Sequence, residues 1–221
     1  MRQAIHSKVV ASAPGATNEA WAEVIAAAEA DPHARIPGSL RHDHQPDVDV
    51  ALSVEIKSAA VLVPLVSRGN GFTVLLTRRP EHLSEHPGQV SFPGGRVEPD
   101  DRGPVETALR ETEEEVGLPR ARVEVAGRLE NYLVGTGYRV TPVVGFVDPP
   151  AAYAPDATEV AEVFEVPLEF ILDSANYRQE KIRTPVFERH FHVLEHDGHV
   201  VWGATAGILV NLRDILNAPE L

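Results

Sequence analysis

The stretch RETEEEVG, Arg110 to Gly117, places four glutamates within five residues and ends on a glycine. Acidic side chains three or four residues apart on a helix repel one another, and each such pair costs about 0.2 to 0.5 kcal/mol. A glycine after a run of helix-forming residues is typical of a helix end. The stretch therefore predicts the last turns of a helix whose carboxylates form either a solvated face or a cation site.

The helix predicted over residues 105–116 carries an apolar stripe and a separate set of carboxylates. Glu111, Glu114 and Glu115 stand at i, i+3 and i+4, so their side chains meet on one face. We expect this face to lie well off the apolar stripe, and Glu113 to point elsewhere. The stripe itself is predicted to face the core through these residues: Val105, Ala108, Leu109, Thr112 and Val116.

Three convergent carboxylates suit a hard divalent cation, because Mg²⁺ and Mn²⁺ take oxygen ligands. The run Phe92-Pro93-Gly94-Gly95 precedes the helix, and its glycines let the backbone come close to a ligand. A glycine carbonyl there could add a further oxygen. The residues alone thus favour a metal site without excluding a plain solvated helix face.

The composition restricts the functional class. The 221 residues include 20 Lys and Arg against 33 Asp and Glu, a formal charge of −13 that argues against nucleic-acid or anionic-membrane binding. The chain has no cysteine, which excludes disulfides, thiolate metal sites and cysteine nucleophiles. The longest apolar run, Ala59 to Val66, is too short for a membrane span. We expect a cytoplasmic enzyme or ligand-binding protein.

The chain divides into an extension over residues 1–58 and a domain over residues 59–221. The extension holds an alanine-rich segment, residues 18–30, that is predicted to be a helix, followed by a polar connection. Its cluster His42-Asp43-His44 is either a metal site or a solvated loop, and the loop is favoured. The role of the extension stays open between a lid, a dimer contact and a cover for a sheet edge.

The domain is rich in predicted strands. Residues 59–66 and 72–78 form a predicted hairpin, residues 123–134 and 138–147 are two further strands, and a strand runs into a short helix within residues 157–173. A late hairpin surrounds Asp197-Gly198, and residues 204–216 are a helix. Strands around a few helices predict a mixed α/β (α+β) sandwich rather than the regular alternation of a Rossmann domain.

The segment from Gly95 to Leu118 resembles the Nudix box, in which a glycine and an isolated glutamate precede Arg-Glu-aliphatic-x-Glu-Glu-x-Gly-aliphatic. The chain departs from it at Thr112, where an aliphatic residue is usual, and by one extra residue in the loop. The isolated glutamate therefore has no exact counterpart, and Asp100 or Asp101 could stand in for it.

The resemblance implies a Nudix-type α/β/α sandwich with a mixed sheet and a metal-binding loop–helix–loop. It implies a hydrolase that cleaves the pyrophosphate linkage of nucleoside diphosphate derivatives with Mg²⁺ or Mn²⁺. By the same resemblance Arg110 orients the glutamates, and a homodimer is one possible assembly. The implied metal ligands are Glu111, Glu114, Glu115 and the carbonyl near Gly95.

The preceding segment LLTRRPEHLSEHPGQVSFPGG, Leu75 to Gly95, resembles the signature of the coenzyme A pyrophosphatase branch of that family. The implied reaction splits coenzyme A or an acyl-CoA into adenosine 3',5'-bisphosphate and the 4'-phosphopantetheine part. Such a substrate carries a 3'-phosphate besides its pyrophosphate, so it needs cationic side chains near the strand end. The candidates for substrate binding are Arg78, Arg79 and His86. Surface charge is the alternative for each arginine, and a structural role in the loop is the alternative for His86.

The general base has several candidates. Glu114 could accept the proton of water, and Nudix enzymes often use a carboxylate from a later loop, where Glu159 and Glu162 are available. The same two glutamates could equally belong to a half-exposed strand. His190 and His192 are expected to be structural. Two other functions stay open: Nudix hydrolysis of ADP-ribose or a dinucleotide, and a non-catalytic nucleotide sensor.

Overall fold

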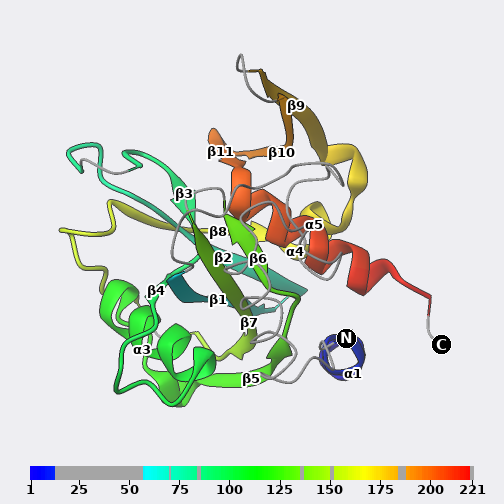
Figure 1. Cartoon of the computed structure of the whole chain (residues 1–221). Coiled ribbons are helices and arrows are strands. Elements are labelled where there is room, and N and C mark those ends of the chain that lie inside the picture. Colours follow the sequence, from blue (N-terminus) through cyan, green and yellow to red (C-terminus); the bar gives the residue numbers. More distant parts are fainter. Residues whose placement is uncertain are drawn as a thin grey trace, which may run out of the picture.

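The computed structural model describes residues 1–12, 57–69, 71–83, 86–134, 137–149, 152–183 and 188–219. An eight-stranded mixed sheet lies between helical layers, and a smaller three-stranded sheet stands beside it (Figure 1). The predicted mixed α+β fold is confirmed. The helix predicted over residues 18–30 and the His42-Asp43-His44 cluster lie outside the described residues.

Three long strands form the centre of the large sheet: β1 (Lys57–Arg68), β2 (Gly71–Arg78) and β7 (Tyr138–Val147). The hairpin between β1 and β2 is antiparallel, as predicted, whereas β1 and β7 run parallel. Alternate residues of each strand point to opposite faces, and both faces are buried in separate apolar clusters. One face contributes Val63, Val74 and Val144, and the other contributes Leu62, Leu75 and Val143.

Shorter strands complete the sheet, whose main order is β3-β2-β1-β7-β5. The flanking strands are β3 (Val90–Ser91), β4 (Gly94–Arg96), β5 (Val123–Arg128), β6 (Tyr132–Val134) and β8 (Glu162–Pro167). The prediction of one strand over residues 123–134 was wrong, because the strand is interrupted at residues 129–131, where the pairing on β7 passes from β5 to β6. Within β5, a bulge between Val125 and Gly127 also shifts the register.

The helices cover the two faces of the large sheet unequally. On one face α3 (Pro104–Val116) packs on β1 and β4, and the short 3₁₀ turn η1 (Arg120–Arg122) follows it. On the other face α5 (Gly203–Asn217) packs with α4 (Leu168–Leu172) and with the second sheet (Figure 1). No helix in the described part of the chain is long and apolar enough to cross a membrane.

The second sheet consists of β9 (Tyr177–Arg183), β10 (Glu188–His196) and β11 (His199–Trp202), after the turn η2 (Ser174–Asn176). The predicted late hairpin is β10–β11, and both turn residues, Asp197 and Gly198, have the positive φ that a two-residue hairpin loop requires. His192 is buried against Tyr177, which agrees with its predicted structural role.

The start of the predicted extension is part of the core. Residues Arg2–Ser12 form α1, which packs against β5 and α5. Ile5 and Val9 are buried in the apolar cluster on the α5 side of the sheet. Gly127 approaches Val9 closely enough that a side chain at position 127 would crowd it. The first twelve residues therefore stabilise the domain that was predicted to begin at residue 59.

Candidate active site

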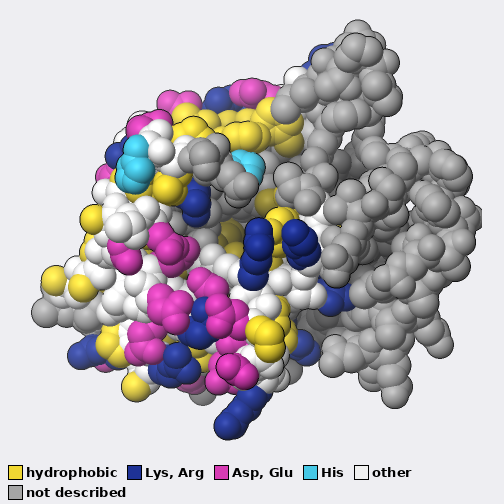
Figure 2. All heavy atoms as spheres, turned by 60° about the vertical axis from the view of Figure 1, so that its left-hand side comes forward, with side chains coloured by type: hydrophobic (Ala, Val, Ile, Leu, Met, Phe, Trp, Pro, Cys, Tyr) yellow, Lys and Arg dark blue, Asp and Glu magenta, His cyan; other side chains and the backbone are white. Residues whose placement is uncertain are grey.

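Helix α3 carries the glutamates identified in the sequence. Pro104 is its first residue, and the helix ends at Gly117, whose left-handed conformation (φ 66°) lets its N–H bond the carbonyl of Glu113 at 3.1 Å. Ala108, Thr112 and Val116 are buried, as predicted. Figure 2 shows acidic side chains gathered on this side of the molecule, with Lys or Arg side chains among them.

Glu115 is buried, with only 8% of its surface exposed. The expectation that all three glutamates lie well off the apolar stripe was therefore wrong for this residue. Glu115 follows Ala108 by seven residues, so two helical turns place it on the same stripe, under strand β4. This spacing is the sequence signal that could have predicted its burial.

The environment of Glu115 opposes its ionisation. Burial, together with the nearby carboxylates of Glu111 and Glu159, raises its pKa to about 8. The backbone N–H of Gly94, which donates to Oε2 at 3.1 Å, and the charge of Arg79 act in the opposite direction. A divalent cation would offset both the cost of burying the Glu115 charge and its repulsion by the neighbouring carboxylates.

Glu111 lies against Gly95. A β-carbon at position 95 would overlap the Glu111 carboxylate, so the glycine is required for this approach. Burial raises the pKa of Glu111, and the guanidinium of Arg110 partly offsets that rise. The carbonyl-bearing strand β4 and the carboxylate of Glu111 are thus next to each other, as the predicted metal site requires.

Arg110 connects the loop to the glutamates. Its Nη1 donates to Glu111 Oε1 at 3.0 Å and to Glu114 Oε2 at 3.1 Å. Its Nη2 donates to the carbonyl oxygen of Arg96 at 3.2 Å. Arg110 therefore fixes the position of two of the three predicted ligands relative to β4.

Asp101 holds the other edge of the same guanidinium. Its two carboxylate oxygens accept from Nε and Nη2 of Arg110, each at 3.0 Å. The carboxylate also accepts from the Glu98 N–H and the Thr107 hydroxyl, and the side chain is 5% exposed. These bonds, Arg110 first, hold the Asp101 pKa well below its usual range. Of the two loop acids considered, the structure therefore connects Asp101 to the site, while Asp100 is exposed.

A later loop brings another glutamate to the site. The N–H groups of Asp156 and Ala154 donate to the carbonyls of Glu115 and Val116, at 2.9 and 3.0 Å, and so dock the loop on the end of α3. Glu159, in the turn that follows, is close enough for its charge to raise the pKa values of Glu111 and Glu115.

Glu162, the other candidate base, is already paired. Its carboxylate accepts from Arg78 Nε at 3.0 Å and lies 3.3 Å from His199 Nε2. The bond from Arg78 is the main reason that the pKa of Glu162 is lowered. The structure thus separates two glutamates that the sequence left equivalent.

Comparison with known proteins identifies the family. Residues 57–185 match the family model described as the NUDIX domain. The chain belongs to the Nudix family. It is 39% identical over 173 residues to a protein of Yersinia pestis (strain Pestoides F) named uncharacterized Nudix hydrolase NudL, which covers 78% of this chain and 83% of the relative. The NudL protein of Yersinia pseudotuberculosis serotype O:1b (strain IP 31758) gives the same values.

A solved Nudix structure resembles the chain at lower identity. RenU, a Nudix hydrolase from M. smegmatis, is 22% identical, with a TM-score of 0.48 over 76% of this chain and 91% of that chain. The family membership makes this protein a Nudix hydrolase, an enzyme that acts on a nucleoside diphosphate derivative. Nudix hydrolases generally use divalent ions such as Mg²⁺ or Mn²⁺.

The residues present fit such an ion. All of the candidate donors are oxygens, the Glu115 carboxylate is buried and hard to ionise alone, and Gly95 leaves room for Glu111. Within the described ranges, however, no three His, Cys, Asp or Glu side chains already surround one point. Glu114 is 60% exposed and turned to Arg110. The three-glutamate Nudix ligand set therefore stays a prediction that requires Glu114 to leave Arg110.

The three predicted substrate residues lie in different surroundings. Arg78 is held by Glu162 and lies 3.7 Å from Glu81. Arg79 is close enough for its charge to lower the pKa of Glu115, and its Nε is buried without a hydrogen-bond acceptor among the described residues. His86 is exposed, has a positive φ of 54°, and accepts the Gln89 N–H on its carbonyl at 3.2 Å. Of these three side chains, Arg79 is the one whose charge acts on a glutamate of α3.

Proposed function

We propose that this Nudix hydrolase cleaves the pyrophosphate of coenzyme A or an acyl-CoA, releasing adenosine 3',5'-bisphosphate and the 4'-phosphopantetheine part. One observation carries the proposal. The Leu75–Gly95 segment that resembles the coenzyme A pyrophosphatase signature runs from the end of β2 through β3 to β4, and ends against Glu111 and Glu115. The segment that carries the resemblance therefore supplies the two glycines, Gly94 and Gly95, that lie against the glutamates.

Four groups would hold the metal: the carboxylates of Glu111, Glu114 and Glu115 and the carbonyl of Gly95. A bound Mg²⁺ or Mn²⁺ supplies neutralisation of phosphoryl charge and activation of water. Arg110, fixed by Asp101, keeps Glu111 in place before the ion binds. Arg79, whose Nε has no acceptor among the described residues and whose charge acts on Glu115, is our proposed donor to a phosphoryl oxygen.

Glu159 is our proposed general base. It is exposed, so it can exchange its proton with solvent, and its charge reaches both Glu111 and Glu115. Glu114, the other base considered, is bound to Arg110 and belongs to the proposed ligand set. Glu159 would take the proton of the attacking water as the oxygen bonds to phosphorus and the bridging oxygen leaves.

Replacing Glu159 by glutamine should lower kcat by about 10²-fold, because the amide cannot accept the proton. The matched variant Glu162→Gln should lower kcat by less than about threefold, since that carboxylate pairs with Arg78 and His199 instead. Steady-state kinetics with saturating metal measure both. A larger loss of kcat for Glu162→Gln than for Glu159→Gln would contradict this assignment.

A substrate panel tests the proposed reaction. Purified protein with Mg²⁺ or Mn²⁺ is given coenzyme A, acetyl-CoA, ADP-ribose and a dinucleoside tetraphosphate, and the products are separated by chromatography. We expect the highest kcat/KM for coenzyme A or its thioester, with adenosine 3',5'-bisphosphate as a product. The Glu115→Gln variant, purified in parallel, reports any contaminating pyrophosphatase. Turnover of ADP-ribose or the dinucleotide without turnover of coenzyme A would overturn the proposal.

A further inference from the structure

Arg139, at the start of β7, is a partly buried arginine to which the described residues give no acidic partner. Its Nη2 donates to the Ser58 hydroxyl at 2.9 Å, which is the hydrogen bond that the structure gives its side chain. Burial lowers the pKa of its guanidinium, and no carboxylate offsets that effect. A partly buried guanidinium that is hydrogen-bonded to a hydroxyl, and to no carboxylate of the described residues, keeps N–H donors that an anionic group of the substrate could occupy.

Three other partly buried arginines of the described chain, unlike Arg79, form ion pairs with carboxylates. Arg78 pairs with Glu162, Arg110 with Asp101, and Arg213 with Asp214. With a formal charge of −13, the protein has an excess of acids to pair with its cations. The absence of a carboxylate at Arg139, within the described residues, is therefore not explained by a shortage of acids.

Arg139 lies on the same face of the sheet as the Nudix glutamates. In the strand register Ser58 is opposite Arg139, while Ala60, two residues on and on the same face, is opposite Gly95. Strand spacing then places the Cα atoms of Arg139 and Gly95 about 12 Å apart. An arginine side chain and one nucleotide together can span that distance.

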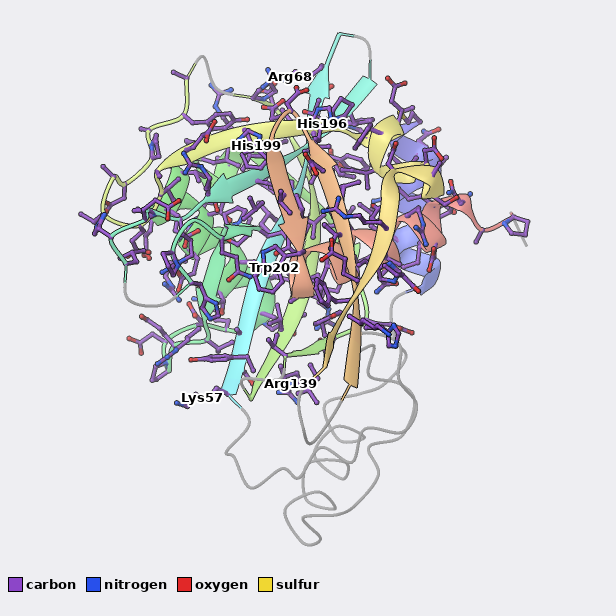
Figure 3. All side chains as sticks on the ribbon, turned by 90° about the horizontal axis from the view of Figure 1, so that it is seen from above. Lys57, Arg68, Arg139, His196, His199 and Trp202 are labelled. Atoms are coloured by element: carbon purple, nitrogen blue, oxygen red, sulfur yellow. The ribbon has the colours of Figure 1, made fainter. Side chains whose placement is uncertain are left out.

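The surrounding sheet end is basic. Lys57 begins β1 at this end, and Figure 3 shows Lys57 and Arg139 close to the same end of the sheet. Arg96, which follows the metal-site glycine, lies over the Tyr138 ring at 5.3 Å from its centre. An anion that reaches this end of the sheet would therefore meet positive charge on an otherwise acidic protein.

We infer that Arg139 binds the 3'-phosphate of the substrate while its pyrophosphate lies at the glutamates of α3. The inference rests on the proposed function, since the 3'-phosphate is a group that coenzyme A carries and ADP-ribose lacks. The planar guanidinium, held on one side by Ser58, has further N–H groups to donate to a phosphate dianion. Arg139 would thus be a specificity residue rather than part of the bond-breaking machinery.

The test compares coenzyme A with 3'-dephospho-coenzyme A on the purified, metal-loaded enzyme. Arg139→Gln should raise KM for coenzyme A by about 10- to 100-fold, the loss expected for a charged hydrogen-bonded contact. KM for 3'-dephospho-coenzyme A should change by less than about twofold, because that substrate lacks the phosphate. Arg139→Lys keeps the charge but loses the planar fork of donors, so its KM for coenzyme A should lie between those of the wild type and Arg139→Gln. This variant replaces Arg139→Gln in the test if the glutamine variant does not fold.

A second measurement does not depend on turnover. Calorimetry should show that the wild type binds adenosine 3',5'-bisphosphate more tightly than AMP, and that Arg139→Gln removes this difference. Arg128→Gln, at an exposed arginine of β5, is the matched control and should leave both measurements unchanged.

The outcomes separate the two proposals. Equal losses for both coenzymes in Arg139→Gln, or no loss for either, would overturn the 3'-phosphate site and leave the proposed reaction standing. A protein that fails to hydrolyse coenzyme A, but whose preference for adenosine 3',5'-bisphosphate depends on Arg139, would keep the site and overturn the reaction. A loss confined to coenzyme A supports both.

Discussion

Replacing Glu115 by glutamine should lower kcat by at least about 10³-fold, because an amide is a poor ligand for a hard cation and several kcal/mol of transition-state stabilisation depend on the ion. Metal affinity, measured by calorimetry with Mn²⁺, should fall in parallel. The fold should be retained, since the glutamine oxygen can still accept the Gly94 N–H. Retention of wild-type activity would disprove the metal assignment.

The same substitution should stabilise the metal-free protein at alkaline pH. The pKa of Glu115 is raised from 4.5 to about 8 in the folded chain, so the folded state holds a proton that the unfolded state releases. The stability of the metal-free wild type should therefore fall as pH rises from about 4.5 to about 8. At pH 8 in EDTA, the free energy of unfolding of Glu115→Gln should exceed that of the wild type by about 2 to 4 kcal/mol. Near pH 4.5 this difference should vanish.

Glu113→Gln is the matched control on the same helix. Glu113 pairs with Arg120 at 2.9 Å and points away from the site, as the helical spacing predicted. This variant should keep kcat within about twofold and should not change the pH dependence of unfolding. If Glu113→Gln and Glu115→Gln gave equal losses of activity, the division of the four glutamates into two groups would be wrong.

Replacing Asp101 by alanine should reduce the free energy of unfolding by about 2 to 4 kcal/mol, because it leaves a mostly buried guanidinium without its bidentate partner. Activity should also fall by about 10- to 100-fold, since Arg110 would no longer be fixed beside Glu111 and Glu114. Urea denaturation and steady-state kinetics measure the two effects. Asp100→Ala, at the exposed neighbour, should change neither.

The contribution of Asp101 to the free energy of unfolding should depend on pH in the opposite sense to that of Glu115. The pKa of Asp101 is held below its ordinary value of 3.8, so its contribution is present above that value and is lost as pH falls toward the folded-state pKa. The difference between wild type and Asp101→Ala should therefore be full at pH 7 and smaller below about pH 3.8. A difference that does not change with pH would show that the ion pair is not its source.

The sequence predicted the elements whose local pattern is strong. The β1–β2 hairpin, β7, α3 and the Asp197-Gly198 hairpin were predicted, because turn residues and apolar periodicity specify them locally. The bulge before Gly127 was not predicted, because α1, which packs against the strand there, lies more than a hundred residues earlier in the chain.

At the site, spacing alone separated Glu113 from the other glutamates, and the resemblance gave Arg110 its orienting role, which the observed bonds support. Spacing did not show that Asp101 fixes Arg110, because a loop with one extra residue has no defined register until it folds. It also did not distinguish Glu159 from Glu162, because their difference lies in which distant groups they meet.

The sequence by itself determined the chemical type of this protein: an oxygen-ligand site on a helix after a Gly-Gly loop, within a Nudix box. Helical periodicity and glycine conformation act over a few residues, so a local pattern is enough to specify them. Only the tertiary structure decided which charges are buried, which are paired and which are left without an acid. Glu115 owes its properties to β4, Asp101 to Arg110 of α3, and Arg139 to the start of β1. Desolvation and pairing depend on what the whole fold places around each group.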